Sequence, residues 1–532
     1  SPTALTITKT NTLTKETMSG VTFSLLDSSG NPVAVTQTGD GAYSVNSGGS
    51  ATFITGSNGT AVISYLPIGS YTLRETPLDG FVTPQDVSVS FTGANSLSVK
   101  NQPTALQFNK TDSVTGEPLD GGAFQIAENG TAISLTRMSD GVYKKDAAGG
   151  STFTTHGGKA TIYGLTAGIP YVVSELTAPA GYTKDADKTV TVSGSSSASV
   201  PATVTMIDSP MALRFTKTDA LTGNLMDGAA FSLYDGETLI KLRKVENGVY
   251  TPDEDAESTF TTQGGTALIA PLGAGSYVIA EEQAAAGFSV AADVTATVTE
   301  ASSSENPATG TMQDAPLTLT VKKVDGISKA PIGGASFRLF DSKGNVLKVS
   351  PILGREGWYG VNENGVSDFT LPASGSATIV YVPQGTVEVK EVSAAPGYAL
   401  PAGTVTAVLG SYNTYTSPAT ITVENDPLAV LLEKVDASDK SPLANVVFKI
   451  KDADGHYLRF TLQEDGSYTV SADGEDSFQT NADGKATILY IPTGSYALEE
   501  QQHPGFAPTE AQAFTVTTEN TVDYPSKIGV EN

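Results

Sequence analysis

Short apolar stretches that alternate with polar residues recur along the whole chain, and they indicate strands. In LTITKTN at residues 5–11, the leucine, the isoleucine and the lysine share one face, and the threonines share the other, because strand side chains alternate with a period of two. Gly, Asp and Asn bound these stretches, which is typical of hairpin turns. No stretch has the period of a long amphipathic helix. The pattern predicts an all-β fold.

The pattern repeats five times at intervals of roughly a hundred residues, the size of a domain rather than of a solenoid turn. Each copy opens with a lysine-containing strand: LTITKTN, LQFNKTD, LRFTKTD, LTVKKVD or VLLEKVD. A later strand ends in glutamate (YTLRE, YVVSE, YVIAE, VEVKE or YALEE), and LSVKN, VTMID, GTMQD, ITVEN or IGVEN closes the copy. We expect five domains, over residues 1–103, 104–210, 211–316, 317–427 and 428–532. Prolines at the joints leave little linker, which favours a semi-rigid rod.

One lysine, one glutamate and one Asn or Asp fall on the apolar face of their strands in every copy. The same parity selects Lys323 over Lys322, Glu281 over Glu282 and Glu500 over Glu499. The resulting five sets are Lys9, Glu75 and Asn101; Lys110, Glu175 and Asp208; Lys217, Glu281 and Asp314; Lys323, Glu391 and Asn425; and Lys434, Glu500 and Asn532.

Burial would change the protonation states of these side chains and so make them reactive. It lowers the pKa of a lysine and raises that of a glutamate, so both move toward their neutral forms. A neutral amine beside an Asn or Asp side-chain carbon, with a protonated Glu to polarise the carbonyl and shuttle protons, can form an amide and expel ammonia or water. The alternative is a buried ion pair or hydrogen-bonded trio without chemistry. Five copies in the same register favour the reaction.

The motifs around these residues resemble the tandem B-type repeats of the collagen-adhesin family (CnaB), which build stalks and pilin shafts on Gram-positive bacteria. The resemblance rests on the K-x-D of KTD and KVD and on the closing NQP, DSP, DAP and NDP. It also rests on the glutamate box, which reads ETPLDGF, ELTAPAGY, EEQAAAGF, EVSAAPGY and EQQHPGF in the five copies. It implies immunoglobulin-like (prealbumin-like) sandwiches in which a spontaneous isopeptide bond, catalysed by the Glu, joins the lysine of each set to its Asn or Asp. The first copy departs from the pattern with KTN and a shortened segment between its Glu and Asn.

Composition limits the other functions. The 532 residues include no cysteine, so disulfides and thiol chemistry are excluded, and the net charge of −26 argues against binding to nucleic acid or anionic membranes. We expect no cofactor, no metal site and no turnover of an external substrate. The Asp-rich turns 452–455 and 473–476 lack a full calcium loop, and His156, His456 and His503 occupy unrelated positions. Trp358 is aligned with the tyrosines of GAYSV and GSYTV and is expected to pack.

The sequence thus predicts a structural stalk of an extracellular adhesin, anchored to the cell wall in its full-length parent. We expect a monomeric rod, not inserted in the membrane, whose host or cell-surface ligand binds through regions outside this fragment. One alternative is a sortase-polymerised shaft pilin, although Tyr524-Pro525-Ser526-Lys527 only approximates the pilin motif and no LPxTG signal is present. The other is an adhesin region whose loops contact matrix protein or glycan.

Overall fold

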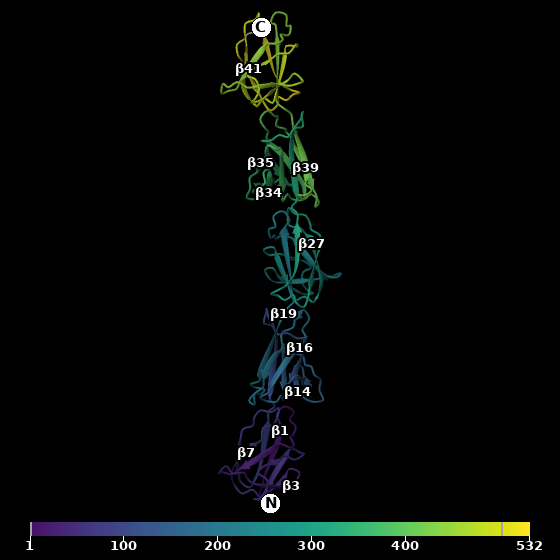
Figure 1. Cartoon of the computed structure of the whole chain (residues 1–532), viewed down its shortest axis with the longest axis vertical. Helices are drawn as coiled ribbons and strands as arrows, with labels where there is room; N and C mark the ends of the chain where they lie inside the picture. The colour runs from purple at the N-terminus through teal and green to yellow at the C-terminus, as the bar shows by residue number, and fades with distance from the viewer. Residues whose placement is uncertain (1–2, 502–503) are drawn as a thin grey trace.

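The computed structural model describes residues 3–501 and 504–532 and shows five β-sandwiches in a single file, with the chain termini at opposite ends of a rod (Figure 1). Strands account for 53% of the residues and form ten sheets, and no helix occurs in the described part of the chain. The prediction of an all-β rod of five sandwich domains is confirmed.

The repeats are built from the following strands. Repeat 1 contains β1 (Ala4–Asn11), β2 (Thr22–Leu26), β3 (Val35–Gly39), β4 (Ala42–Val45), β5 (Phe53–Ile54), β6 (Thr60–Ser64), β7 (Gly69–Glu75), β8 (Val87–Phe91) and β9 (Ala94–Asn101). Repeat 2 contains β10 (Ala105–Asp112), β11 (Ala123–Glu128), β12 (Thr131–Ala132), β13 (Leu135–Ser139), β14 (Val142–Lys145), β15 (Lys159–Tyr163), β16 (Pro170–Thr177), β17 (Tyr182–Thr183), β18 (Lys188–Thr191) and β19 (Ala202–Pro210). Repeat 3 contains β20 (Leu213–Asp219), β21 (Ala230–Asp235), β22 (Thr238–Ile240), β23 (Leu242–Glu246), β24 (Val249–Pro252), β25 (Phe260–Thr261), β26 (Thr266–Ile269), β27 (Gly275–Gln283), β28 (Val294–Val298) and β29 (Ala308–Asp314).

The last two repeats follow the same plan. Repeat 4 contains β30 (Thr318–Asp325), β31 (Ser336–Phe340), β32 (Val346–Leu347), β33 (Val349–Pro351), β34 (Trp358–Val361), β35 (Asp368–Thr370), β36 (Ser376–Val380), β37 (Gly385–Ser393), β38 (Thr404–Leu409) and β39 (Ala419–Asn425). Repeat 5 contains β40 (Ala429–Val435), β41 (Val447–Lys451), β42 (Phe460–Leu462), β43 (Tyr468–Val470), β44 (Phe478–Gln479), β45 (Lys485–Leu489), β46 (Gly494–Glu500), β47 (Gln512–Val516) and β48 (Ser526–Glu531).

Each sandwich pairs a sheet that holds the first and last strands with a sheet that holds the glutamate strand. In repeat 1 the two sheets run β3-β4-β6-β1-β9 and β5-β2-β7-β8. The first strand pairs antiparallel with β6 on one side and parallel with β9 on the other. Every other repeat has the same parallel pair, formed by β10 and β19, β20 and β29, β30 and β39, and β40 and β48.

The inner faces of the two sheets form a separate core in each repeat. In repeat 1 this core includes Leu5, Ile7, Phe23, Phe53 and Leu73, all at most 2% exposed. The alternating residues that the sequence assigned to the apolar face are thus the ones removed from water, and their burial is the main drive for folding. Each repeat therefore has a hydrophobic core of its own.

The four joints between repeats are built around the glycine of the glutamate box. Gly80, Gly181, Gly287 and Gly397 have φ values of +79°, +86°, +83° and +85°. A Cβ atom on Gly287 would lie 2.6 Å from the carbonyl oxygen of Tyr381 in the next repeat, and one on Gly397 would lie 2.5 Å from that of Tyr490. Only glycine combines this backbone conformation with so close an approach. The box glycine therefore serves the joint between domains.

The structure locates Trp358 and the shortened segment of repeat 1. The alignment of Trp358 with the tyrosines was wrong by one residue: Tyr359 pairs with Ile379 as Tyr43 pairs with Ile63, and Trp358 stands in the place of Ala42. The neighbouring tyrosine obscured this register, and Trp358 instead stacks with the Arg355 guanidinium at 4.7 Å. The shortened segment of repeat 1 lies between β8 and β9, where two residues connect the strands.

Candidate functional site

The parallel pairing of the first and last strands places the lysine beside the Asn or Asp in every repeat. In repeat 2, Lys110 pairs with Met206 and Asp112 pairs with Asp208, so the lysine and the aspartate lie two positions apart on neighbouring strands. Both point to the inner face, as their parity requires. The glutamate strand of the opposite sheet completes the set from across the core. All five predicted sets are brought together in this way.

The three repeats with an asparagine share the hydrogen bond from the amide to the glutamate, and repeat 1 adds one from the lysine to the asparagine. In repeat 1, Lys9 Nζ donates to Glu75 Oε2 at 2.6 Å and to Asn101 Oδ1 at 2.5 Å, while Asn101 Nδ2 donates to Glu75 Oε1 at 2.5 Å. The glutamate thus contacts both the amine and the amide nitrogen. The corresponding amide-to-glutamate bonds measure 2.7 Å in repeats 4 and 5. The Lys–Glu ion pairs there measure 3.0 Å and 3.7 Å.

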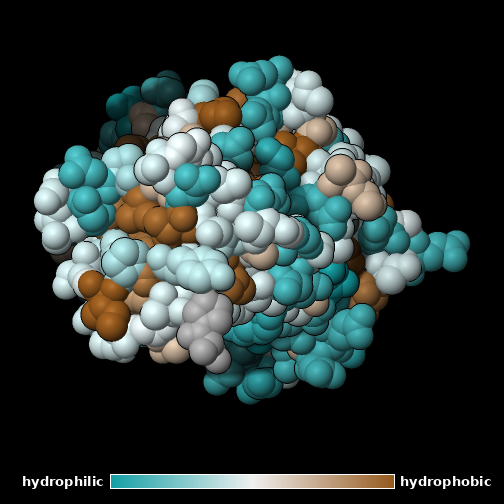
Figure 2. Space-filling view, turned by 90° about the horizontal axis from the view of Figure 1, so that it is seen from below, coloured by the Kyte–Doolittle hydropathy of each residue, from teal (hydrophilic) through white to brown (hydrophobic). Residues whose placement is uncertain are grey.

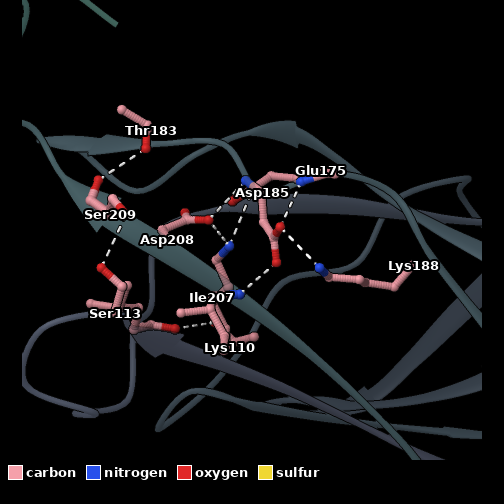
Figure 3. Close-up of polar contacts among 12 residues, drawn as sticks. Lys110, Ser113, Glu175, Thr183, Asp185, Lys188, Ile207, Asp208 and Ser209 are labelled. Carbon is pink, nitrogen blue, oxygen red and sulfur yellow. Dashed lines mark hydrogen bonds and ion pairs between the residues drawn. The ribbon is translucent and has the colours of Figure 1, made fainter. Parts of the chain in front are cut away.

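The two repeats with an aspartate place two carboxyl groups around one lysine. Lys110 Nζ lies 2.9 Å from Glu175 Oε2 and also donates to Asp208 Oδ1 (Figure 3). Lys217 likewise lies 2.9 Å from Glu281 Oε1 and donates to Asp314 Oδ1. The side chains of all these residues are 0% exposed. One cation therefore faces two buried acids, and full ionisation would leave an uncompensated negative charge.

Burial shifts the pKa values in the direction that the chemistry needs. Desolvation lowers the pKa of Lys9, Lys323 and Lys434, in the three repeats whose acceptor is asparagine. Desolvation also raises the pKa of Glu391, and it raises the pKa of Glu175 and of Asp314 to about 7. Glu175 and Asp314 are therefore partly protonated near neutral pH.

A phenylalanine forms the wall of each site and was missed in the sequence. Lys9, Lys110 and Lys217 each place Nζ 5.3–5.7 Å from the ring centre of Phe23, Phe124 or Phe231. Phe337 and Phe448 occupy the same position, since every one of these rings lies opposite the glutamate in the strand register. The ring excludes water from the amine and provides a face that attracts a cation. Its recurrence in VTFSLL, GAFQIA, AAFSLY, ASFRLF and VVFKIK was the signal that could have revealed it.

A backbone N–H group four residues after the box glycine was also missed. Asp185 N donates to Glu175 Oε2 and to Asp208 Oδ1, both at 3.1 Å (Figure 3). Ala291 N donates to Glu281 at 2.7 Å, and Thr509 N donates to Glu500 at 3.1 Å. Repeats 1 and 4 have Pro84 and Pro401 at this position, and proline has no N–H to donate. The donor therefore orients the glutamate in three of the five repeats.

The other candidates remain separate from these sites. Asp452, Asp454 and His456 bring ligand atoms within 4.8 Å of one another at the surface of repeat 5. Asp452 Oδ1, however, accepts the backbone N–H groups of Asp454 at 3.0 Å and His456 at 2.8 Å, which is the geometry of a turn. His156 lies on another repeat, and His503 lies outside the described residues.

Five sandwiches, each with a buried lysine and a buried glutamate between its two sheets, define a tandem array of prealbumin-like modules. The family model of the prealbumin-like fold domain matches residues 3–103, 104–207, 211–311, 317–426 and 429–527, and the chain belongs to this family. No curated protein matches the chain.

Solved structures to which the chain is similar include the following three. The Bacillus anthracis TIE protein is 17% identical, with a TM-score of 0.33, over 80% of this chain and 72% of that protein. A streptococcal ancillary pilin is 18% identical, with a TM-score of 0.27, over 60% of this chain and 98% of the pilin. The shaft pilin SpaA from Lactobacillus rhamnosus GG is 19% identical, with a TM-score of 0.23, over 40% of this chain and 97% of the pilin.

Residues 3–501 and 504–532 contain no helix with the length and apolar character needed to cross a bilayer.

Proposed function

We propose that this chain is the stalk of an extracellular adhesin, anchored to a Gram-positive cell wall in its parent, and that each repeat closes one intramolecular isopeptide bond. The observation that carries the proposal is the fivefold occurrence of one set in which every lysine and every glutamate is buried. Burying a lysine and one or two acids costs free energy that an apolar core would avoid. A repeat that gains a covalent bond from this arrangement has a physical reason to retain it.

The reaction follows from the contacts in the asparagine repeats. The neutral lysine amine attacks Cγ of the asparagine, and the glutamate, which contacts both nitrogens, takes a proton from the amine and gives one to the leaving amide nitrogen. The Nζ–Cγ bond forms, the Cγ–Nδ2 bond breaks, and ammonia leaves. The fold supplies proximity and a dry site. In the aspartate repeats the lysine nitrogen attacks the aspartate Cγ, the glutamate takes a proton from the amine and gives one to the leaving hydroxyl of the carboxylic acid, the Cγ–O bond breaks, and water leaves instead.

The proposed bonds join Lys9 to Asn101, Lys110 to Asp208, Lys217 to Asp314, Lys323 to Asn425 and Lys434 to Asn532. Each bond forms once and is not remade, so the protein modifies itself and does not turn over a substrate. No cofactor takes part in these steps.

Intact-mass spectrometry of the purified chain tests the proposal. Three losses of ammonia and two of water lower the mass by about 87 Da relative to the sequence. A smaller mass deficit would show that some repeats had not formed their bond. Tryptic peptides branched at the named lysines would identify the repeats that had. An unshifted mass would refute the proposal and leave five buried ion pairs without chemistry.

A sortase-polymerised pilin shaft is the second candidate, and one surface lysine favours it. Lys527 is exposed on the last strand, three residues after Tyr524, which is 76% exposed. An acceptor lysine for another protein's carboxyl end must be accessible in this way. Polymers extracted from the parent cell wall would then contain peptides branched at Lys527, and their absence would leave the stalk as the proposed role.

A further inference from the structure

The carboxyl group that would react in repeat 2 has two oxygens with different surroundings. Asp208 Oδ1 accepts a hydrogen bond from Lys110 Nζ and another, at 3.1 Å, from the backbone N–H of Asp185 (Figure 3). Asp208 Oδ2 is buried and accepts no hydrogen bond from the residues that the structure describes. When an amine attacks Cγ, one oxygen takes up negative charge and the other leaves. The contacts therefore distinguish the two oxygens before the reaction begins.

This site lies inside the sandwich, where charge is poorly solvated. The side chains of Lys110 and Asp208 are both 0% exposed. Polar residues make up much of the rod's surface, as the end-on view shows (Figure 2), but they lie outside the core. Charge that develops on a buried oxygen is stabilised chiefly by hydrogen-bond donors that already point at it, and each donor counts for more in a low dielectric. The N–H of Asp185 is a donor of this kind.

The side chain of Asp185 holds its own N–H in this position. Asp185 Oδ2 accepts the backbone N–H of Ile207 at 2.8 Å, and Ile207 directly precedes Asp208 on β19. Asp185 Oδ1 accepts hydrogen bonds from the N–H of Ala186 at 2.7 Å and from Lys188 Nζ at 3.0 Å. The loop is thereby attached to the strand that carries the acceptor. A donor fixed in this way needs no reorganisation when the charge develops.

Repeat 3 has the same kind of acceptor without this contact. Ala291 stands in the place of Asp185, and its N–H donates to Glu281 Oε2 at 2.7 Å. Within the described part of the chain, no backbone N–H donates to the carboxyl group of Asp314, which accepts a hydrogen bond from Lys217. Alanine has no carboxylate that could attach the loop to β29. Repeats 2 and 3 therefore form a natural pair that differs in this donor.

We propose that the Asp185 N–H is the oxyanion donor of repeat 2, and that Asp208 keeps Oδ1 in the amide and loses Oδ2 as water. The inference rests on the proposed isopeptide bond. Lys110 Nζ attacks Cγ of the carboxylic acid, Oδ1 takes up the negative charge, and the N–H stabilises that charge. Glu175 takes a proton from the amine and gives one to Oδ2. The Cγ–Oδ2 bond then breaks, and Oδ1 becomes the carbonyl oxygen of the amide.

An ester in place of the amide at residue 185 tests this inference, because it removes the N–H and leaves every side chain in place. The full chain is made by cell-free translation with the α-hydroxy analogue of aspartate at position 185, quenched in acid at intervals and digested. Peptides branched at Lys110 and at Lys217 are quantified in the same sample, so repeat 3 is an internal standard. We expect repeat 2 to close about 100-fold more slowly than in the unmodified chain, while repeat 3 keeps its rate.

Two further esters separate the oxyanion role from its alternative, in which the N–H acts only by orienting Glu175, the other group it contacts. The same ester at the exposed Asp187 of this loop is the matched control and should leave the rate of repeat 2 unchanged. An ester at Ala291 removes a contact to the glutamate alone. It should therefore slow repeat 3 by less than the ester at 185 slows repeat 2.

The outcomes distinguish this inference from the proposed function. Equal slowing by the esters at 185 and 291 would show that the N–H acts through the glutamate alone, and an unchanged rate with the ester at 185 would show that it does not act. Loss of hydrogen-exchange protection in β10 and β19 would show that the donor serves folding instead. Each of these results would overturn the oxyanion assignment and leave the isopeptide bonds in place. The absence of branched peptides from the unmodified chain would refute the proposed function itself.

Discussion

Replacing Lys110 by methionine tests whether the side-chain set of repeat 2 carries load. Met fills much of the lysine's volume but has no amine, so repeat 2 alone loses its proposed bond. Tension that reaches β10 must then cross to β19 through the strand pairing of residues 106–112 with 202–208. These strands are parallel and loaded in shear, and once they separate, the 98-residue interval between Lys110 and Asp208 is released. At about 3.4 Å per residue this interval extends to about 330 Å, less a folded separation under about 10 Å.

Single-molecule pulling on the full chain measures this length. The Lys110→Met chain should show one unfolding step of about 330 Å, because the other four repeats remain bridged. Lys144→Met, which removes a partly exposed lysine of the same repeat, should show none, like the unmodified chain. Repeated steps of this length in the unmodified chain would refute the covalent load path and with it the proposed stalk mechanics.

Three further predictions follow from the same geometry. Glu281→Ala should leave Lys217 and Asp314 unjoined and restore about 18 Da to the intact mass, whereas Glu282→Ala, at an exposed neighbour, should change only the residue mass; the reverse result would contradict the strand register. In Lys110→Met the fully buried Glu175, whose pKa burial already raises to about 7, loses its cation. Its folded-state pKa then lies still further above its unfolded value. Urea titrations of repeat 2 should therefore show stability that is complete below pH 4.5 and falls by about 1.4 kcal/mol per pH unit as the pH rises through 7; a flat profile would contradict the raised pKa of Glu175. Phe231→Ala in a Lys217→Met background should lower the free energy of unfolding of repeat 3 by about 3–5 kcal/mol in urea, while Val245→Ala at a 57% exposed position should stay within about 0.5 kcal/mol.

Much of the site could be predicted from the sequence because strand parity is a local property. The alternation in LTITKTN identifies the buried face from neighbouring residues alone, and it selected Glu281 over Glu282 without knowledge of the partner strand. Parity does not reveal which strands pair, so the proximity of the first and last strands had to come from the family resemblance, and the parallel pairing of β1 and β9 was not predicted. The Phe23 wall could have been found from its fivefold recurrence.

Other features were hidden because they depend on groups far apart in the chain. The N–H of Asp185 reaches two carboxylates only through the path of its loop, and no spacing rule predicts that path. The glycine of the box was visible as a motif, but its reason lies in the following repeat, where Tyr381 comes within contact of Gly287. The same holds for the hydroxyl of Tyr381 and its acceptor Asp219, which are separated by 162 residues.

The parallel pairing of first and last strands also determines how the rod responds to proteolysis. With the proposed bonds in place, each repeat is a closed covalent ring, and residues 101–110, 208–217, 314–323 and 425–434 connect one ring to the next. A protease that cuts a surface hairpin opens a ring but leaves both of its ends attached to the rod through the side-chain amide. Single cuts separate the chain only within the four connecting segments, which consist largely of paired strand residues, including β10, β20, β30 and β40. The exposed turns, where proteases act most readily, are thus the places where a cut does least harm.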